Sequence, residues 1–243
     1  MNQMTLKNRH QNKDVALLRI FAVLILLLSY FCSHAQVLPD DNFKILKAGT
    51  FGGSICQGQT NDAKQIWNDC LAKDSIYLQI TTCGIGGMGF SSNTVKNVPW
   101  QIQNADTFDI YILWCSTNDT HAGQIGEIGT TDSTTQSGGL LKSIELIRSR
   151  NDSAIILLFT SLPFFSNEDG YLSTGKLSQY VNAQKQFCEA YHIPYLDQFS
   201  LCGININNYD PYYVSDKLHL TADGYRLVAS LQADFINTIV DSR

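Results

Sequence analysis

Apolar residues along the chain gather in short continuous runs that are separated by longer segments of mixed polarity. The runs cover residues 43–48, 75–82, 108–115 and 154–160, with a weaker run at 194–197. Continuous apolar runs of this length are typical of strands that are buried on both faces of a sheet. Between the runs, apolar residues recur at helical spacing over residues 63–72, 140–150 and 179–191. The pattern therefore predicts an α/β fold, a three-layer α/β/α sandwich around a five-stranded parallel sheet.

The last segment of the chain has the clearest helical pattern. Thr221 is placed to cap the N-terminus of a helix, and Asp223 puts a negative charge in its first turn, where the helix dipole favours one. Apolar residues follow at steps of three and four: Val228, Leu231, Phe235 and Ile239. This spacing predicts a helix with one apolar face, which would cover the sheet.

Residues 1–35 have the three-part pattern of a secretory signal peptide. Basic residues precede an almost wholly apolar run at 20–31, and Ser33-His34-Ala35 supplies small residues at the two positions that a signal peptidase reads. The apolar run is too short to span a bilayer core of about 30 Å. We therefore expect 1–35 to be removed on export and 36–243 to form a single domain. An uncleaved N-terminal anchor is the alternative.

The charge balance excludes one class of partner. The chain has 17 Lys and Arg against 22 Asp and Glu, a formal net charge of -5. It therefore lacks the basic surface that binds nucleic acid or anionic membranes, and we expect no nucleic-acid partner and no stable membrane association after signal cleavage.

No pair of cysteines has Cys-x-x-Cys spacing, so neither structural zinc nor thioredoxin-like chemistry is expected. Disulfide pairing and oligomeric state stay open.

Ligands bind a parallel sheet outside the carboxyl ends of its strands, so chemistry is expected just after each apolar run. The segments in these positions are 49–58, 83–92, 116–121 and 161–169, with 209–219 before the final helix. The segment 120–139 is rich in Gly, Ser and Thr and is expected to be a mobile loop near the same rim.

A serine, a histidine and a carboxylate stand in two of these segments. Ser54 follows Gly52 and Gly53, which allow a sharp turn at the strand end. A serine hydroxyl needs a base, and His219 has Asp216 in the same short turn to hold one of its ring nitrogens. The residues alone leave an alternative open, in which Ser54 and Asp216 cap helices and His219 is merely exposed.

Two further segments carry polar or glycine-rich motifs. The side-chain amide of Asn118 could donate to a developing oxyanion, although an Asn-Asp turn would explain the same residues. The segment 84–89 fits the dinucleotide fingerprint Gly-x-Gly-x-x-Gly. No helix signal begins within it, however, so nucleotide binding is not expected.

In chain order, these segments resemble the four blocks of the SGNH, or GDSL-type, hydrolase family, and the resemblance extends from about Lys44 to the final helix. The matching residues, block by block, are Ser54 with Gly58, Gly87, Asn118 with Asp119, and Asp216 with His219. The resemblance implies a flavodoxin-like fold and a hydrolase of carboxylic esters that needs no metal and no cofactor.

The resemblance also implies a role for each matching residue. Ser54 would be the nucleophile, His219 the base and Asp216 the residue that orients it. The oxyanion hole would consist of the backbone amides of Ser54 and Gly87 and the side chain of Asn118. Together these groups would form and hydrolyse an acyl-enzyme.

The chain departs from the family pattern at two positions. Gly53 stands where the family usually has Asp, and Ser116 stands where it usually has Gly. Neither position supplies a reacting group, so the departures concern the shape and rate of the site more than the class of reaction. They leave open a function of another class, a catalytically impaired carbohydrate-binding or surface protein with the same fold.

The substrate is predicted from export and from the polar rim. We expect short acyl groups, such as acetyl, on a small molecule or a carbohydrate, because the family includes such deacetylases; a lipid or lysophospholipid ester is the alternative. The candidate substrate-binding residues are Trp100, His121, Tyr212 and Tyr213. The aromatic rings could stack on sugars.

Overall fold

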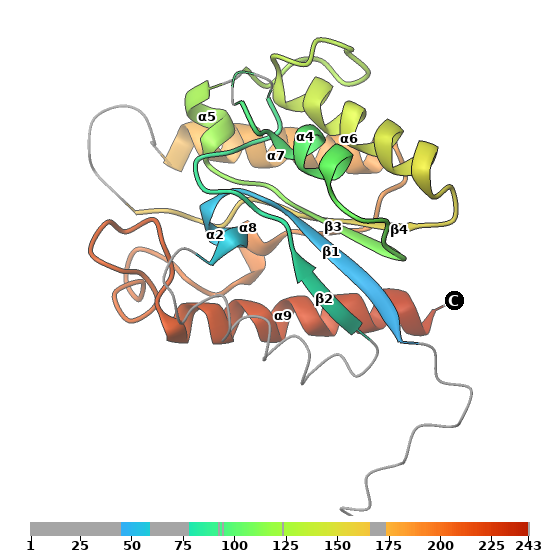
Figure 1. Cartoon of the computed structure of the whole chain (residues 1–243). Coiled ribbons are helices and arrows are strands. Elements are labelled where there is room, and N and C mark those ends of the chain that lie inside the picture. The colour runs from blue at the N-terminus through green and yellow to red at the C-terminus, as the bar shows by residue number, and fades with distance from the viewer. Residues whose placement is uncertain are drawn as a thin grey trace, which may run out of the picture. The chain divides into compact units, whose positions relative to one another are not determined.

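The computed structural model describes residues 45–58, 78–91, 93, 95–122, 124–165 and 174–242 (Figure 1). These residues belong to one compact unit, Lys44–Arg243. The expected signal segment 1–35 and the expected helix 63–72 lie outside the described residues. None of the helices in the described ranges is long and apolar enough to cross a membrane.

The sheet has five strands: β1 (Leu46–Gly52), β2 (Leu78–Thr82), β3 (Ile110–Trp114), β4 (Ile155–Phe159) and β5 (Tyr195–Leu196). Each neighbouring pair is parallel, and the strand order is β2-β1-β3-β4-β5. This is the flavodoxin-like order, in which the ligand edge lies where the direction of winding reverses, between β1 and β3. The predicted five-stranded parallel sheet is confirmed.

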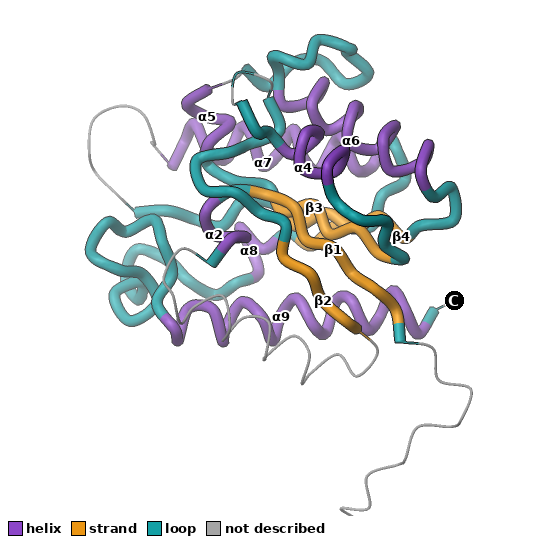
Figure 2. The backbone as a smooth tube through the Cα atoms, viewed as in Figure 1, coloured by secondary structure: helices purple, strands orange, loops and turns teal. Residues whose placement is uncertain are grey.

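Helices cover both faces of the sheet. They are α2 (Ser54–Gln57), α4 (Val98–Asn104), α5 (Asn118–Ala122), α6 (Gln136–Arg150), α7 (Thr174–Ala190), α8 (Gln198–Leu201) and α9 (Ala222–Asp241). Helices α4, α6 and α7 lie on one side of the sheet and α9 lies on the other (Figures 1 and 2). The predicted three-layer α/β/α architecture is therefore confirmed.

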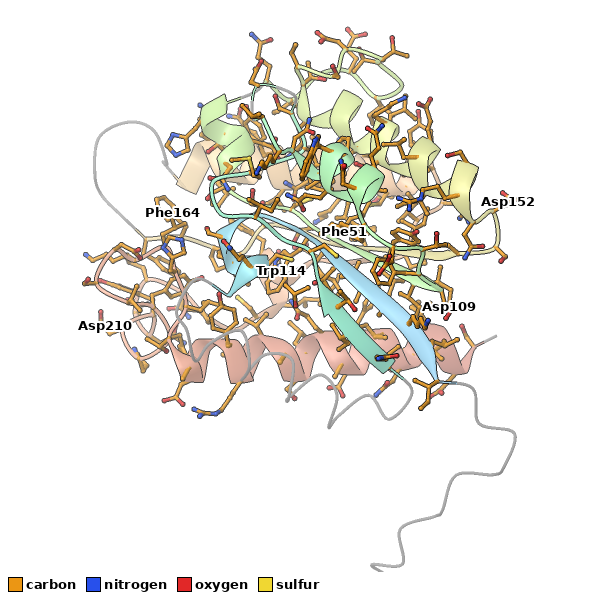
Figure 3. All side chains as sticks on the ribbon, in the orientation of Figure 1. Phe51, Asp109, Trp114, Asp152, Phe164 and Asp210 are labelled. Atoms are coloured by element: carbon orange, nitrogen blue, oxygen red, sulfur yellow. The ribbon has the colours of Figure 1, made fainter. Side chains whose placement is uncertain are left out.

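The sheet separates the core into two clusters, one on each face, and its central strand β3 contributes side chains to both. Alternate side chains point to opposite faces, so Ile112 packs in the cluster that includes α9, and Leu113 packs in the cluster that includes α4, α6 and α7. Trp114 and Phe51, both labelled in Figure 3, likewise belong to different clusters. Burying one such side chain stabilises the fold by about 1.5–3 kcal/mol.

The first strand extends further than its hydrophobic pattern predicts. The prediction was 43–48, whereas β1 continues to Gly52, which pairs with Trp114. The small residues that follow the apolar run belong to the strand. They are small because neighbouring residues leave no room for larger ones. A Cβ atom at Gly49 would come within 2.5 Å of the Phe108 ring. As a result, Ser54 is separated from the end of the strand by a single residue.

Helix α6 also begins earlier than predicted, at Gln136, so the end of the expected loop 120–139 is helical. The Thr135 hydroxyl caps the helix by accepting a hydrogen bond from the Gly138 amide at 3.1 Å. Gly138 and Gly139 are needed here because added Cβ atoms would lie 2.0 and 2.1 Å from backbone oxygens of neighbouring loops. The sequence pattern did not predict α4 or α5.

The final helix agrees with its prediction. Helix α9 begins at Ala222, and the Thr221 hydroxyl accepts a hydrogen bond from the Gly224 amide at 3.2 Å. Its apolar residues pack in the core beneath the sheet, as the spacing indicated. The helix thereby fixes the position of the turn that precedes it, which carries Asp216 and His219.

Candidate active site

Ser54 begins the short helix α2 at the carboxyl edge of the sheet, directly after β1 and Gly53. The approach of the neighbouring segments is very close at Gly53. A Cβ atom there would lie 2.6 Å from Asn118 Nδ2 and 2.8 Å from the Met88 carbonyl oxygen. Glycine therefore lets the segments that follow β1, β2 and β3 meet around Ser54. The structure brings these sequence-predicted residues together.

Ser54, His219 and Asp216 form one hydrogen-bonded chain. Ser54 Oγ lies 2.8 Å from His219 Nε2, and His219 Nδ1 lies 2.6 Å from Asp216 Oδ2. Because an ionised carboxylate can only accept, Nδ1 carries the proton, and this leaves Nε2 free to accept the serine proton. The arrangement is that of a nucleophile, a base and a residue that orients the base.

The turn from Asp216 to His219 is held by its own backbone. The other oxygen of Asp216, Oδ1, accepts hydrogen bonds from the amides of Leu218 and His219 at 2.8 and 2.9 Å. Lys217 has a φ of 56°, in the left-handed region that non-glycine residues seldom adopt. The Val214 amide donates to the His219 carbonyl at 2.9 Å and so closes the turn. The imidazole is thus fixed by local contacts as well as by the carboxylate.

The same contacts keep Asp216 ionised. Partial burial raises the pKa of its carboxyl group, but the hydrogen bonds from the His219 side chain and from the amides of His219 and Leu218 outweigh burial. The net effect is a pKa below the usual 3.8. Asp216 is therefore a charged acceptor for the histidine ring at neutral pH.

A second group of atoms lies beside Ser54 and Gly53, in the loop after β2 and in α5: a Cβ atom at Gly86 would lie 3.8 Å from Ser54 Cβ, and one at Gly53 would lie 2.6 Å from Asn118 Nδ2. Gly87 has a φ of 76°, and an added Cβ atom there would meet nothing within 4 Å. Within the described part of the chain, no group accepts a hydrogen bond from its amide. Asn118 Nδ2 donates to the Met88 carbonyl at 2.9 Å, which holds the Asn118 amide beside this loop. Amide donors so placed can stabilise an oxyanion.

Asp119 anchors the loop that carries Gly87. It is fully buried, and its carboxylate accepts hydrogen bonds from the backbone amides of Phe90 and Ser91, each at 2.9 Å. Burial raises the pKa of Asp119 and outweighs the lowering by these bonds. Gly89 packs directly against this carboxylate, since a Cβ atom there would lie 2.5 Å from Oδ1. Sequence reasoning matched Asp119 to the family but missed this role.

Two of the candidate substrate residues are tyrosines that precede the Asp216 turn. Tyr212 is half-buried. Tyr213 is only 4% exposed, and its hydroxyl donates to the Pro163 carbonyl at 2.5 Å. Its ring packs in the core and offers no free face to a sugar, which corrects the expectation for Tyr213. A tyrosine ring can pack in a core or stack on a sugar, and the burial of the side chain shows which of the two applies.

The other two candidates lie on the surface. Trp100, in α4, is 38% exposed, and the Lys96 ammonium group lies 5.5 Å from its ring centroid. His121 is exposed on α5, one helical turn beyond Asn118. Partial burial and the neighbouring Lys176 ammonium group lower the pKa of His121. Both side chains are exposed to solvent.

An aromatic pair that the sequence analysis missed packs beside the Asp216 turn. The rings of Phe165 and Tyr209 stack with centroids 4.9 Å apart, and the Lys217 ammonium group lies 5.6 Å from the Tyr209 centroid. The Phe165 amide donates to the Lys217 carbonyl at 3.2 Å. The signal in the sequence was Phe165 in the segment that follows the fourth apolar run.

The described residues offer little to a metal or a nucleotide. None of them forms a group of three or more His, Cys, Asp or Glu side chains that could hold a metal ion. After the glycine-rich segment 84–89, the next helix begins only at Val98, so no helix N-terminus faces those glycines as the dinucleotide fingerprint requires. Cys115 and Cys188 are buried free thiols, and burial raises the pKa of Cys188 to about 12.

Comparison with known proteins gives one family. The sequence model of the GDSL-like Lipase/Acylhydrolase family matches residues 50–227. This span contains every residue of the hydrogen-bonded chain and of the facing amide group. A search among curated proteins finds no significant match.

Solved structures resemble the chain across most of its length. A protein from Lactobacillus plantarum shares 21% identity, with a TM-score of 0.71 and coverage of 80% of this chain and 98% of that one. A possible lipase from Chitinophaga pinensis shares 18% identity, with a TM-score of 0.61 and coverage of 80% and 98%. A lipase/acylhydrolase from Enterococcus faecalis shares 17% identity, with a TM-score of 0.59 and coverage of 79% and 95%. At these identities the likeness establishes the fold.

Proposed function

Because the chain belongs to the GDSL-like lipase/acylhydrolase family and is a carboxylic ester hydrolase, we propose that it is an exported serine esterase with Ser54 as its nucleophile. The observation that carries the proposal is the hydrogen-bonded chain from Ser54 through His219 to Asp216, with distances of 2.8 and 2.6 Å. A serine is a weak nucleophile unless a base takes its proton, and the histidine is within reach to do so.

In the first half of the reaction, Ser54 Oγ attacks the carbonyl carbon of the ester, and His219 Nε2 takes the serine proton. The electron pair of the carbonyl bond moves to the oxygen, which becomes an oxyanion. The tetrahedral intermediate collapses, the bond to the alcohol breaks, and His219 returns its proton to the departing alcohol oxygen. Asp216 stabilises the imidazolium ion meanwhile without taking the proton itself.

In the second half, water hydrolyses the acyl-enzyme. His219 Nε2 takes a proton from water as the water oxygen attacks the acyl carbon, and it returns that proton to Ser54 Oγ when the acid leaves. In both halves the oxyanion would accept hydrogen bonds from the amides of Ser54 and Gly87 and from the Asn118 side chain. Loss of one such donor typically slows turnover by about 10²- to 10³-fold.

The proposed substrate is a short acyl ester, such as an acetyl ester, of a small molecule or a carbohydrate. Trp100 and His121 support this assignment because both are exposed at the surface, and an exposed indole ring can stack on a sugar. Export is proposed from the basic, apolar and small-residue segments of 1–35. Export would bring the enzyme to acetylated glycans outside the cytoplasm.

The experiment compares hydrolysis of p-nitrophenyl acetate, butyrate and octanoate, and acetate release from an acetylated polysaccharide, by the wild-type protein and Ser54→Ala. We expect the acetate ester and the polysaccharide to be preferred and Ser54→Ala to lose about 10⁴-fold or more of kcat. Preference for octanoate would replace the carbohydrate assignment by lipid esters. Undiminished activity of Ser54→Ala would refute the mechanism.

A further inference from the structure

The two positions at which the chain departs from its family, Gly53 and Ser116, are in contact. A Cβ atom at Gly53 would lie 3.0 Å from Ser116 Cβ, and the same atom would meet Asn118 Nδ2 and the Met88 carbonyl. The space beside Gly53 is therefore filled by the Ser116 side chain and by the two groups next to it. A larger residue at 53 and a serine at 116 would compete for this space.

The Ser116 hydroxyl uses all of its hydrogen-bonding capacity on this one group of atoms. Its proton goes to the Met88 carbonyl at 3.1 Å, and its oxygen accepts from the Asn118 backbone amide at 3.3 Å and from Asn118 Nδ2 at 3.2 Å. Asn118 Nδ2 also donates to the Met88 carbonyl at 2.9 Å. Ser116 is 7% exposed, so water competes little for these bonds.

The positions of Asn118 Nδ2 and its two acceptors allow one Asn118 proton to stay free. The triangle of Asn118 Nδ2, Ser116 Oγ and the Met88 oxygen has nearly equal sides, so the two acceptors subtend an angle of about 60° at the nitrogen. The two N–H bonds of an amide diverge by about 120°, so one of them can serve both acceptors as a three-centre bond. In that three-centre arrangement the other proton is left for the oxyanion.

Without the Ser116 hydroxyl, little would fix this arrangement. The terminal torsion of an asparagine side chain has a broad energy profile, so the amide would be held by the Met88 carbonyl alone. The Met88 carbonyl would itself lose the hydroxyl proton that holds it. Met88 directly follows Gly87, so this loss also loosens the peptide next to the second proposed donor.

We propose that Ser116 is a positioning residue of the oxyanion hole, which holds the Asn118 amide and the Met88 carbonyl and occupies the space that Gly53 leaves. This inference rests on the proposed function. The hydrogen bonds of the Ser116 hydroxyl go to Met88 and Asn118, so it acts through Asn118. On this inference the departures at 53 and 116 leave the oxyanion hole intact, because Gly53 gives room to the Asn118 amide and the Met88 carbonyl that Ser116 holds.

The test is a double-mutant cycle of Ser116→Ala and Asn118→Ala with two measurements. One is kcat and KM on p-nitrophenyl acetate, and the other is the rate at which a fluorophosphonate modifies Ser54, which also places charge on an oxygen in the hole. We expect Ser116→Ala to lower kcat and the modification rate about 10- to 50-fold with KM unchanged. In the Asn118→Ala background, its effect should shrink to about 3-fold or less.

Ser143→Ala is the matched control. Ser143 is fully buried in α6, and its hydroxyl donates to the Gly139 carbonyl at 2.8 Å, so the variant loses a buried hydroxyl far from the Asn118 amide in the chain. It should keep the wild-type kcat. Ser116→Gly, which removes the hydroxyl and adds no bulk, should reproduce the loss and replaces Ser116→Ala if that variant unfolds.

The outcomes separate the inference from the function. An active wild-type protein whose kcat and modification rate are unchanged by Ser116→Ala overturns the inference alone. Multiplicative effects in the cycle, or an equal loss in Ser143→Ala, also overturn it because Ser116 would then not act through Asn118. A folded wild-type protein that neither hydrolyses esters nor reacts with the fluorophosphonate overturns the proposed function, and the inference with it.

Discussion

Adding one methyl group at Gly53 is expected to disable the site while leaving the triad residues in place. The Cβ atom of Gly53→Ala would lie 2.6 Å from Asn118 Nδ2 and 2.8 Å from the Met88 carbonyl oxygen. Ordinary contacts begin at about 3.4 Å, so these atoms would have to move by about 0.8 and 0.6 Å. Both atoms belong to the group that holds the proposed oxyanion donors.

The size of the effect follows from these displacements. A misplacement of about 1 Å in an active site can cost about 10²-fold in rate, so we expect kcat to fall about 10- to 100-fold. Overpacking of this kind also costs about 1–3 kcal/mol of stability, and each kcal/mol lowers Tm by about 2–4 °C for a chain of this size. The rate and the stability should therefore fall together.

The assay measures kcat and KM on p-nitrophenyl acetate and Tm by circular dichroism. Gly49→Ala is the matched control, because its Cβ atom would come within 2.5 Å of the Phe108 ring, in the core and away from Asn118. It should lose stability and keep kcat. If Gly53→Ala keeps the wild-type kcat, or if Gly49→Ala loses kcat to the same degree, the close approach at Gly53 does not control the rate.

Two carboxylates give further predictions. Asp216→Asn should lower kcat about 10²- to 10⁴-fold, measured on p-nitrophenyl acetate, because the histidine ring loses its charged acceptor. Since the pKa of Asp216 is lowered by folding, its stabilising contribution is present above pH 3.8 and is lost as the pH falls further; acid unfolding curves of Asp216→Asn and wild type should converge there. Asp119→Ala should destabilise more than Asp119→Asn in urea, because alanine leaves the amides of Phe90 and Ser91 unpaired at about 1–3 kcal/mol each. Burial raises the pKa of Asp119, so the protonated carboxyl group stabilises the folded protein, and this stabilisation is lost as the pH rises through the raised pKa. In Asp119→Asn the free energy of unfolding should depend less on pH over this range.

The sheet could be predicted from the sequence because its strands are buried on both faces. The runs around β3 and β4 are short and continuously apolar, which is typical of strands buried on both faces of a parallel sheet. The end of β1 could not be predicted, because glycine has a low strand preference. Gly49 and Gly52 stand there because Phe108 and Trp114 leave no room for a Cβ atom. The short helix α4 was not predicted either; Pro99 stands in its first turn, where a proline is tolerated.

The candidate site was predictable residue by residue but not contact by contact. Ser54, Asn118 and His219 each follow or precede an element at the carboxyl edge, and their order along the chain matched the family. Gly53 and Ser116 lie far apart in the sequence. They come into contact because each follows one of two neighbouring strands, β1 and β3. Their pairing therefore looked like two independent departures until the strand order was known.

Mass spectrometry of the protein after reaction with a fluorophosphonate shows directly whether Ser54 is the nucleophile. We expect one covalent adduct on the peptide that contains Ser54, no adduct in Ser54→Ala, and a strongly slowed reaction in His219→Ala, because the 2.8 Å contact with Nε2 activates the hydroxyl. An adduct on another residue, or ester hydrolysis that persists when Ser54 is replaced, would contradict this role of Ser54.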